Sequence, residues 1–487
     1  MNINPLNCID FYKADHRRQY PEGTTLVYSN FTPRSDRLAL KSSVYDGKVV
    51  FFGLQYFIKS FLIETWNKEF FNKPKEEVIS RYKRRMDNSL GVDAIAVDHV
   101  EALHDLGYLP IEIDALPEGS AVNMKIPVLT IHNTKDEFFW LTNYFESVMS
   151  NMLWKPCTSA TTARQYRMLL DKYAKETGGD EGFVDFQAHD FSFRGMSGLE
   201  DACLSGAGHL LFFKGTDTVP AIDLLEDYYG ANSDEELVGC SVPATEHSVM
   251  CMGTKDDEIG TFRRLITELY PSGIVSIVSD TWDLWKVLDE YAPALKNEIE
   301  ARDGKVVFRP DSGNPEDIIC GDLNVPVDNH AYKGCLNLLW EHFGGTINDE
   351  GYKVLNPKVG LIYGDSITLQ RAEAILRRMK DMGFASTNIV FGIGSFTYQY
   401  CTRDNFGFAM KATYGEVKGE ARSIYKDPIT DSGTKKSAKG LLKVVKRDGE
   451  YVLIDSCDNT EGTELKTVFK DGTLRVSHTL SKLREGN

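Results

Sequence analysis

The central part of the chain alternates short apolar runs with stretches that have helical periodicity. Between residues 183 and 395, five apolar runs end abruptly in polar, acidic or glycine residues, and an amphipathic stretch follows. That succession is typical of βα units. The runs are residues 210–213, 275–278, 306–308, 359–363 and 388–391. The pattern predicts an α/β fold with an irregular (β/α) barrel, whose ligands bind at the carboxyl ends of the parallel strands.

The stretch after residue 365 illustrates the predicted helices. Asp365 and Ser366 are good N-cap residues, and the arginines downstream lie off the apolar face. The apolar face consists of Ala372, Ile375, Leu376 and Met379. A helix of this kind is expected to cover one face of the sheet.

The two ends of the chain have a different pattern. Residues 109–130 show short strands broken by proline and glycine, residues 139–154 form an apolar helix, and residues 442–474 contain two hairpin turns, Asp448-Gly449 and Asp471-Gly472. We expect both ends to pair in one flanking α+β domain. The predicted domains are residues 1–155 with 405–487, and a barrel over residues 156–404.

Length and charge narrow the classes of function. A chain of 487 residues exceeds the roughly 250 to 300 residues at which one core stops growing, so two domains are expected. The formal net charge of −16 argues against a nucleic-acid binder, because a phosphate polymer would be repelled by most of the surface. A cleft that gathers a few basic side chains still accommodates a small anion.

Cysteine usage and the absence of long apolar segments predict a cytoplasmic protein. The nine cysteines are scattered and never spaced as CxxC, which favours reduced thiols over a disulfide framework or a zinc site. No apolar run approaches the roughly 18 residues of a membrane span, and the first residues lack the features of a signal peptide.

Two strand ends carry residues suited to a sugar phosphate. Arg309 and Asp311 stand two residues apart and can share one face; the guanidinium suits a phosphate or an aromatic ring, and the carboxylate suits sugar hydroxyls. The alternative for this pair is a solvated ion pair. Gly392 and Gly394 begin a GxG loop without the third glycine of a dinucleotide site, so the loop either cradles one phosphate or makes a simple turn.

A histidine and a basic stretch complete the candidate chemistry. His247 lies in a segment that resembles neither a helix nor a regular strand, where an imidazole can act as acid, base, nucleophile or phosphate ligand, or simply be exposed. Downstream, the chain becomes basic, which suits an anionic substrate or a solvated charged face. The basic stretch contains Arg403, Lys411, Lys426, Lys435 and Lys436.

Taken together, these segments resemble the nicotinamide phosphoribosyltransferase family, within the type II, nicotinate phosphoribosyltransferase-like superfamily. The resemblance covers nearly the whole chain. Its motifs include residues 52–56, 109–113, 140–143, 189–191, 194–195, 213–219, 241–243, 246–248 and 309–315. It implies condensation of nicotinamide with phosphoribosyl pyrophosphate to nicotinamide mononucleotide and pyrophosphate, in a homodimer with shared active sites.

The resemblance also assigns the nicotinamide pocket. The ring lies between Phe191 and Tyr12, the latter from a second subunit, with Arg309 nearby. Asp217 accepts from the carboxamide NH₂, and an anionic carboxylate there repels nicotinic acid. The other residues assigned to substrate binding in this region are Ser241, Val242, Ser276 and Gly364.

The remaining assignments concern the sugar phosphate. Asp311 and Asp365 hold ribose hydroxyls, and Gly394 and Ser395 hold the 5′-phosphate with Arg403. The residues that face pyrophosphate are Arg34, Arg194, Lys411 and Lys426. This chain departs from the family's Gly-Gly-Gly at residues 394–396, and an insertion of a few residues lies within 404–419.

The implied catalytic residues are His247, Asp280, Arg309 and Asp311. Mg²⁺, held mainly by pyrophosphate and not directly by side chains, neutralises the leaving group of an oxocarbenium-like transition state. ATP phosphorylates His247, and Asp280 orients its imidazole.

Three alternatives stay open from the sequence. A nicotinate-specific enzyme of the same superfamily differs mainly at the pocket wall, where Asp217 argues against it. A non-catalytic interaction module on the same fold is the second. A barrel enzyme acting on another sugar phosphate would place a lysine or glutamate at a strand end, where Asp, Arg and Gly predominate instead.

Overall fold

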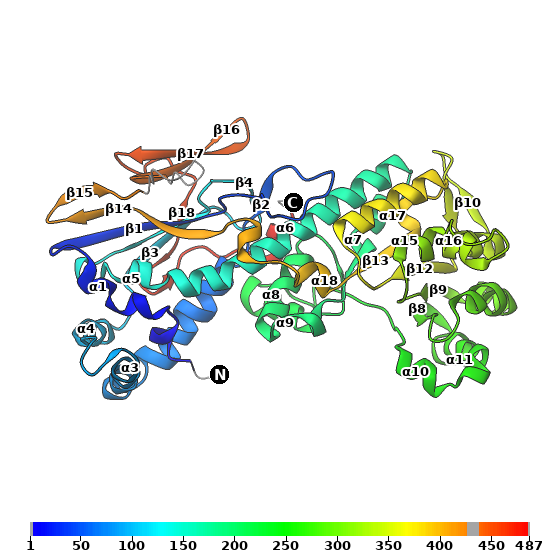
Figure 1. Cartoon of the computed structure of the whole chain (residues 1–487), viewed down its shortest axis with the longest axis horizontal. Coiled ribbons are helices and arrows are strands. Elements are labelled where there is room, and N and C mark those ends of the chain that lie inside the picture. The colour runs from blue at the N-terminus through cyan, green and yellow to red at the C-terminus, as the bar shows by residue number, and fades with distance from the viewer. Residues whose placement is uncertain (1–2, 426–437, 486–487) are drawn as a thin grey trace.

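A parallel β-sheet forms the centre of the barrel domain at one end of the molecule. The structure is a computed structural model that describes residues 3–425 and 438–485. Its six strands lie in the order β7-β6-β13-β12-β9-β8, and every neighbouring pair is parallel. Figure 1 labels four of them, β8, β9, β12 and β13. The strands are β6 Ala188–Asp190, β7 Gly215–Thr216, β8 Ser272–Val278, β9 Asp303–Arg309, β12 Val359–Tyr363 and β13 Ile389–Ile393.

An irregular segment closes this sheet into a ring. Cys240 forms a parallel bridge with Gly215 in one edge strand, β7, and Ala244 forms a parallel bridge with Ser276 in the other edge strand, β8. Four backbone hydrogen bonds accompany these bridges, among them Thr245 N to Ser276 O at 3.0 Å. The predicted irregular barrel is therefore confirmed, with residues 240–245 in place of a regular strand.

Helices cover the outside of the sheet. α17 buries the whole apolar face expected from the sequence, but its N-cap is Thr368, whose hydroxyl accepts from Arg371 N at 3.2 Å, and not Asp365 or Ser366. Helices of the barrel region include α8 Leu199–Leu210, α9 Val219–Tyr229, α10 His247–Met252, α11 Glu258–Arg264, α15 Pro315–Cys320, α16 His330–Phe343, α17 Leu369–Asp381 and α18 Ser395–Tyr398.

One predicted strand is wrong. Residues 210–213 are the end of α8 and the turn that follows it, and all four side chains are buried. The strand of this unit is the two-residue β7 immediately downstream. A four-residue apolar run is too short for periodicity to distinguish a buried helix end from a strand.

An antiparallel sheet forms the flanking domain at the other end of the molecule (Figure 1). The seven strands lie in the order β15-β14-β1-β5-β3-β18-β19, so both chain ends contribute, as expected from the sequence. They are β1 Thr24–Thr32, β3 Ile111–Ala115, β5 Leu129–Asn133, β14 Ala409–Val417, β15 Glu420–Ser423, β18 Lys466–Lys470 and β19 Thr473–Leu474. Helices α3 Lys75–Leu90 and α4 Asp98–Leu106 lie on one side of the sheet.

Both predicted hairpin turns are present. β16 Leu441–Arg447 and β17 Glu450–Cys457 pair across Asp448-Gly449, and β18 pairs with β19 across Asp471-Gly472. All four turn residues have positive φ, between 48° and 83°, which is the conformation that tight hairpins favour.

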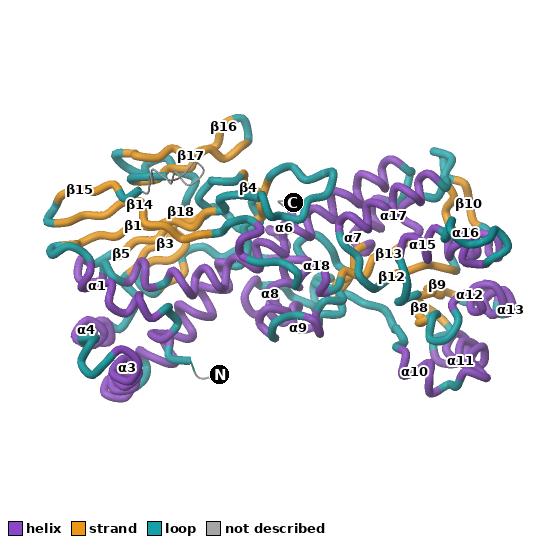
Figure 2. The backbone as a smooth tube through the Cα atoms, viewed as in Figure 1, coloured by secondary structure: helices purple, strands orange, loops and turns teal. Residues whose placement is uncertain are grey.

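α6 Glu146–Glu176 joins the two domains (Figure 2). Leu153 and Cys157 belong to the core of the flanking domain, whereas Ala160 and Tyr166, one to three turns further along, belong to the core of the barrel. The helix continues through Pro156. The two cores are therefore held by one continuous element, which fixes the position of the barrel relative to the flanking sheet. No helix within the described residues is long and apolar enough to cross a membrane.

Candidate active site

The carboxyl ends of the barrel strands carry most of the predicted site residues. Phe191 follows β6, Asp217 follows β7, Asp280 follows β8, and Arg309 ends β9. In parallel α/β sheets these ends meet at one rim. The sequence therefore brings together an aromatic ring, carboxylates and a guanidinium from strands that are far apart in the chain. Others at the same rim are Ser241, Val242, Asp311, Gly364, Asp365, Gly394 and Ser395.

Asp217 is held by two donors. His189 Nε2 lies 2.9 Å from Asp217 Oδ1, and Ser241 Oγ donates to the same oxygen at 2.6 Å. Burial opposes ionisation of this carboxyl, but the hydrogen bonds from His189 and Ser241, together with the charge of Arg309, hold its pKa below the ordinary value. The side chain keeps 46% of its surface exposed, so an ionised carboxylate faces the rim.

Phe191 packs in a space that two glycines leave open. A Cβ on Gly392 would lie 2.3 Å from Phe191 Cδ2, and a Cβ on Gly364 would lie 3.2 Å from Phe191 Cε2. The ring centroid of Phe191 lies 4.8 Å from that of His189. The Phe191 ring thus forms a flat wall beside the fixed carboxylate of Asp217. Gly364 leaves room for this ring because glycine has no side chain.

Ser241 and Val242 lie in the segment that closes the barrel, opposite Ser276. Ser276 N donates to Pro243 O at 2.9 Å, and its Oγ is buried without a hydrogen-bond partner among the described residues. Val242 is partly exposed. The irregular backbone of the closing segment therefore places these side chains at the rim, which a regular strand would not do in succession.

Arg309 and Asp311 do not pair with each other in the hydrogen bonds of this site. Arg309 Nη2 donates to Thr245 O at 2.9 Å, and Asp311 N donates to Asp280 Oδ2 at 2.7 Å. Burial and the neighbouring carboxylates of Asp280 and Asp365 raise the pKa of Asp311, against the opposing charge of Arg309. Arg309 and Asp311 therefore do not form the solvated ion pair that the sequence left open as an alternative.

His247 begins α10, so the segment expected to be irregular is a loop only as far as Glu246. Its Nδ1 lies 3.2 Å from Thr281 Oγ1, and its Nε2 lies 4.0 Å from Asp311 Oδ2. The side chain is 47% exposed. The side chain that contacts the imidazole in the structure is thus Thr281, whereas the carboxylate of Asp280, to which the family resemblance gives the orienting role, accepts from the backbone of Asp311.

The predicted phosphate loop begins a short helix. Gly394 is the N-cap of α18, whose first residue is Ser395, and the described residues leave space around Gly394. Ser395 packs against Gly195, where a Cβ would lie 2.0 Å from its Oγ. Arg194, next to that glycine, is exposed at the same place. The predicted phosphate loop and Arg194 therefore lie close together, with Gly195 between them.

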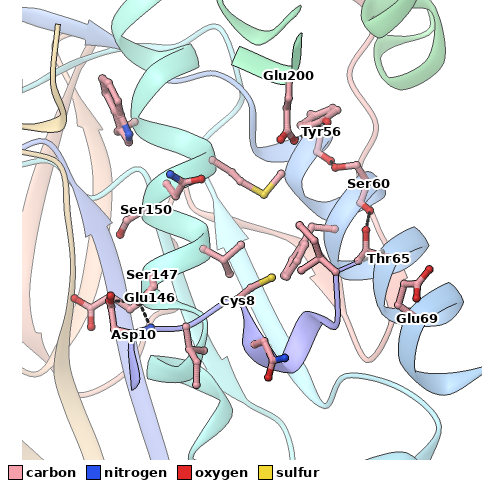
Figure 3. Close-up of a pocket in the computed structure, with 18 of the residues that line it drawn as sticks. Cys8, Asp10, Tyr56, Ser60, Thr65, Glu69, Glu146, Ser147, Ser150 and Glu200 are labelled. Carbon is pink, nitrogen blue, oxygen red and sulfur yellow. Dashed lines mark hydrogen bonds between the residues drawn. The ribbon is translucent and has the colours of Figure 1, made fainter. Parts of the chain in front are cut away.

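A second group of predicted residues lies in or next to the flanking domain. Tyr12 is 59% exposed, Arg34 Nε donates to Gly407 O at 2.9 Å, and Lys411 Nζ lies 3.8 Å from Glu146 Oε1. Tyr12 and Arg403 line a cavity of about 890 Å³. Figure 3 shows this cavity between the start of the chain, the helical residues 56–69, the start of α6 and Glu200. The contacts of the described residues do not join Tyr12 to Phe191. Lys426, Lys435 and Lys436 lie outside the described residues.

Sequence reasoning gave no role to His189, Thr245 or Thr281. His189 stands two residues before Phe191 on β6, and residues at that spacing share one face of a strand, so its place beside the ring was readable from the sequence. Thr245 and Thr281 act through a carbonyl oxygen and a hydroxyl at irregular positions, for which the sequence holds no periodic signal.

Comparisons with known proteins show which family the chain belongs to. Residues 186–473 match the nicotinate phosphoribosyltransferase family, and residues 4–113 match the N-terminal domain of nicotinamide phosphoribosyltransferase. A nicotinamide phosphoribosyltransferase of Acinetobacter baylyi is 62% identical over 99% of this chain and 97% of its own length. Another from Mycoplasma pneumoniae is 36% identical over 90% of this chain and 95% of its own length.

The fold is also found among solved structures. The crystal structure of nicotinate-nucleotide pyrophosphorylase from Pyrococcus furiosus has a TM-score of 0.57 at 14% identity, covering 99% of this chain and 94% of that one. At that identity the likeness concerns the fold alone.

Proposed function

The chain belongs to the nicotinamide phosphoribosyltransferase family, and on that premise we propose how its residues carry out the reaction. The enzyme joins nicotinamide to C1 of phosphoribosyl pyrophosphate, forming nicotinamide mononucleotide and pyrophosphate in NAD salvage. The observation that carries the proposal is the fixed Asp217 carboxylate beside the Phe191 ring at the rim of the barrel.

The pocket chemistry suits nicotinamide. The pyridine ring stacks on Phe191, with Arg309 nearby, and the carboxamide NH₂ donates to Asp217. Because Asp217 is ionised, it rewards an amide donor and repels the carboxylate of nicotinic acid. Ser241, Val242 and Ser276 contribute the polar and apolar wall of the closing segment.

Charge placement supplies the catalysis. Departure of pyrophosphate from C1 leaves a developing cation on the ribose, which nearby carboxylates stabilise, and the ring nitrogen of nicotinamide then forms the new bond. Asp311 and Asp365 are assigned to the ribose hydroxyls, and Gly394, Ser395 and Arg403 to the 5′-phosphate. Because the pyridine nitrogen carries no proton, the reaction requires no general base.

We assign Mg²⁺ mainly to the pyrophosphate oxygens of the substrate. Within the described residues, no group of three or more His, Cys, Asp or Glu side chains is arranged to hold a metal ion. Asp280 Oδ1 is buried without a hydrogen-bond partner among those residues, and Asp311 lies beside it, so the two fit the waters of a hydrated ion. When bound, Mg²⁺ neutralises the leaving group.

Product analysis tests the reaction. With nicotinamide, phosphoribosyl pyrophosphate and Mg²⁺, we expect nicotinamide mononucleotide and an equal amount of pyrophosphate; with nicotinic acid, we expect far less product. Asp217→Asn should lower the preference for nicotinamide about 100-fold, since the carboxylate is lost and an NH₂ donor replaces it. Asp223→Asn, an exposed aspartate six residues downstream in α9, is the matched control. A wild-type preference for nicotinic acid would overturn the assignment.

We further propose that ATP phosphorylates His247. Thr281 Oγ1 can accept from Nδ1–H, which leaves the lone pair of Nε2 as the nucleophile. Nε2 forms the bond to the γ-phosphorus of ATP, the bond from that phosphorus to the bridging oxygen breaks, and ADP leaves. Later transfer of the phosphoryl group to water returns the imidazole and couples ATP hydrolysis to the main reaction.

The test is incorporation of label from γ-³²P-ATP, read as an acid-labile, base-stable phosphoryl group. His247→Ala should lose both the label and the stimulation by ATP, while keeping some ATP-independent synthesis. The control is His330→Ala, which removes another exposed histidine and should behave as wild type. His330 is the first residue of α16, and its Nδ1 lies 3.1 Å from Asp289 Oδ2. An equal ATP response in wild type and His247→Ala would exclude the phosphohistidine.

We propose a homodimer with shared active sites as the working enzyme. Tyr12, Arg34 and Lys411 belong to the flanking domain, whereas Phe191 and Asp217 belong to the barrel rim. A second copy that brings its flanking domain to the rim would complete the aromatic sandwich and the basic cluster around pyrophosphate.

We also propose a cytoplasmic location. The nine cysteines are free thiols, and the described residues contain no disulfide, which supports a reducing compartment.

A further inference from the structure

We propose that His189 is the positioning residue that sets the preference for nicotinamide, by holding the Asp217 carboxylate in a single orientation. The inference rests on the proposed function and extends it to a residue that does not need to touch the substrate. Three observations carry it: the shared acceptor oxygen, the strand register and the ring packing of His189.

The two donors to Asp217 meet at one oxygen. His189 Nε2 at 2.9 Å and Ser241 Oγ at 2.6 Å both contact Oδ1. A carboxylate held at one oxygen by two donors, one from β6 and one from the closing segment, cannot rotate without losing both hydrogen bonds. Neither contact uses Oδ2, so the second oxygen is the one available to a substrate amide at the half-exposed side chain.

The pairing of β6 with β7 places the His189 imidazole next to Asp217. In the parallel pair β6–β7, His189 stands opposite Gly215, and Asp190 opposite Thr216, so Asp217 emerges one residue beyond the paired positions. A Cβ on Gly215 would lie 2.7 Å from His189 Nδ1. The missing side chain at residue 215 therefore gives the imidazole room to lie against its neighbouring strand and reach Asp217.

His189 also touches the aromatic wall. Its ring centroid lies 4.8 Å from that of Phe191 at an interplanar angle of 50°. The side chain is 11% exposed, so it is fixed by packing on one side and by the carboxylate on the other. His189 thus aligns both walls of the pocket: the Phe191 ring, which stacks on the substrate, and the Asp217 carboxylate, which selects it.

The chemistry explains why loss of His189 should change selectivity and not only affinity. Because Asp217 is ionised, His189 must present Nε2–H to it. Without that donor the carboxylate turns more freely and takes up a proton more readily. A protonated carboxyl can donate to the carboxylate of nicotinic acid, so discrimination against the acid falls.

The experiment compares His189→Leu with His189→Gln in the full-length enzyme. For each, kcat/KM is measured with nicotinamide and with nicotinic acid at saturating phosphoribosyl pyrophosphate. Leucine supplies no donor, and the ratio of the two values should fall about tenfold, as expected for one charge-assisted hydrogen bond. Glutamine presents an amide NH₂ at nearly the position of Nε2 and should restore most of the ratio.

A second variant keeps the histidine but displaces it. Gly215→Ala pushes a Cβ toward Nδ1, and we expect the same loss of selectivity. Loss of folding alone would lower both kcat/KM values together and leave their ratio unchanged. The inference is overturned if His189→Leu keeps the wild-type ratio within twofold, or if His189→Gln is no better than leucine. Failure of wild type to prefer nicotinamide would instead overturn the proposed function.

Discussion

At the scale of single residues, glycines are as decisive for this site as charged side chains. Phe191 occupies the volume that a side chain at Gly392 or Gly364 would fill. A Cβ on Gly392 would also lie 2.7 Å from Gly364 Cα, so the added methyl group would collide with backbone as well as with the ring. The aromatic wall of the pocket therefore depends on two positions that form no hydrogen bond through a side chain.

Gly392→Ala should displace the Phe191 ring. We expect the KM for nicotinamide to rise about tenfold, as for loss of an aromatic stack, and the free energy of unfolding to fall by about 1–3 kcal/mol because the core is overpacked. Steady-state kinetics and thermal unfolding measure the two effects. Gly198→Ala is the control, because its backbone is extended and nothing lies within 4 Å of the added Cβ. An unchanged KM in Gly392→Ala would show that the ring does not bind the substrate.

Residue types at the rim were predictable, but their partners were not. The spacing of Arg309 and Asp311 indicated a shared face, yet each is bound to another loop, one to Thr245 and the other to Asp280. Likewise, a hydroxyl, Thr281, contacts His247 where a carboxylate was expected. Such contacts depend on how successive strand ends are placed around the ring, which no local pattern encodes.

At the scale of elements, the sequence was most informative where periodicity was long. α17, β12 and both hairpins occur where the pattern placed them, because thirteen-residue amphipathic helices and Asp-Gly turns have strong local signals. The two-residue β7 and the three-residue β6 have no such signal, since a parallel strand of that length is defined by its neighbours. The site at their ends was therefore located by motif and not by strand prediction.

One buried carboxylate links a helix to the neighbouring domain. Glu118 accepts from Gly53 N at 2.7 Å and from Gln55 N, at the start of α2 Leu54–Tyr56, and from Tyr229 OH at 2.9 Å in α9 of the barrel. Burial raises the pKa of Glu118 to about 7 despite these hydrogen bonds. The start of this helix and the junction of the two domains thus share a single titrating group.

This group should make stability depend on pH. An acid whose pKa is higher in the folded than in the unfolded state contributes its full stability below the unfolded pKa, near 4.5, and loses it as pH rises through about 7. Wild type should therefore lose about 3 kcal/mol between pH 4.5 and 8 from this source. Glu118→Gln, measured by urea unfolding, should remove that slope even if its overall stability is lower.

Glu461→Gln, at an exposed position, controls for the change of charge and should keep the wild-type slope. Equal slopes in wild type and Glu118→Gln would show that Glu118 stays ionised in the folded protein across this range.

At the scale of the whole molecule, the two halves of the proposed site stand on different domains. The barrel rim carries the ring, the carboxylates and the phosphate loop, and the flanking domain carries Tyr12, Arg34 and Lys411, with α6 fixing the two domains relative to each other (Figure 2). Tyr12 is more than half exposed beside a cavity that Arg403 also lines. The contacts of the described residues do not join Tyr12 to the barrel rim, so the proposed homodimer would supply the flanking domain from a second copy.

Subunit mixing tests this arrangement. Tyr12→Ala and Asp217→Ala should each be nearly inactive alone, because every site in either homodimer lacks one residue. After the two are unfolded together and refolded, half of the dimers are mixed, and each mixed dimer has one site with both residues intact and one with neither. Activity should therefore recover to about a quarter of wild type. Mixing Asp217→Ala with Phe191→Ala, both on the barrel rim, is the control and should give no recovery. If both mixtures stay inactive while mixed dimers are demonstrated by tagged subunits, Tyr12 acts within its own chain and the shared site is excluded.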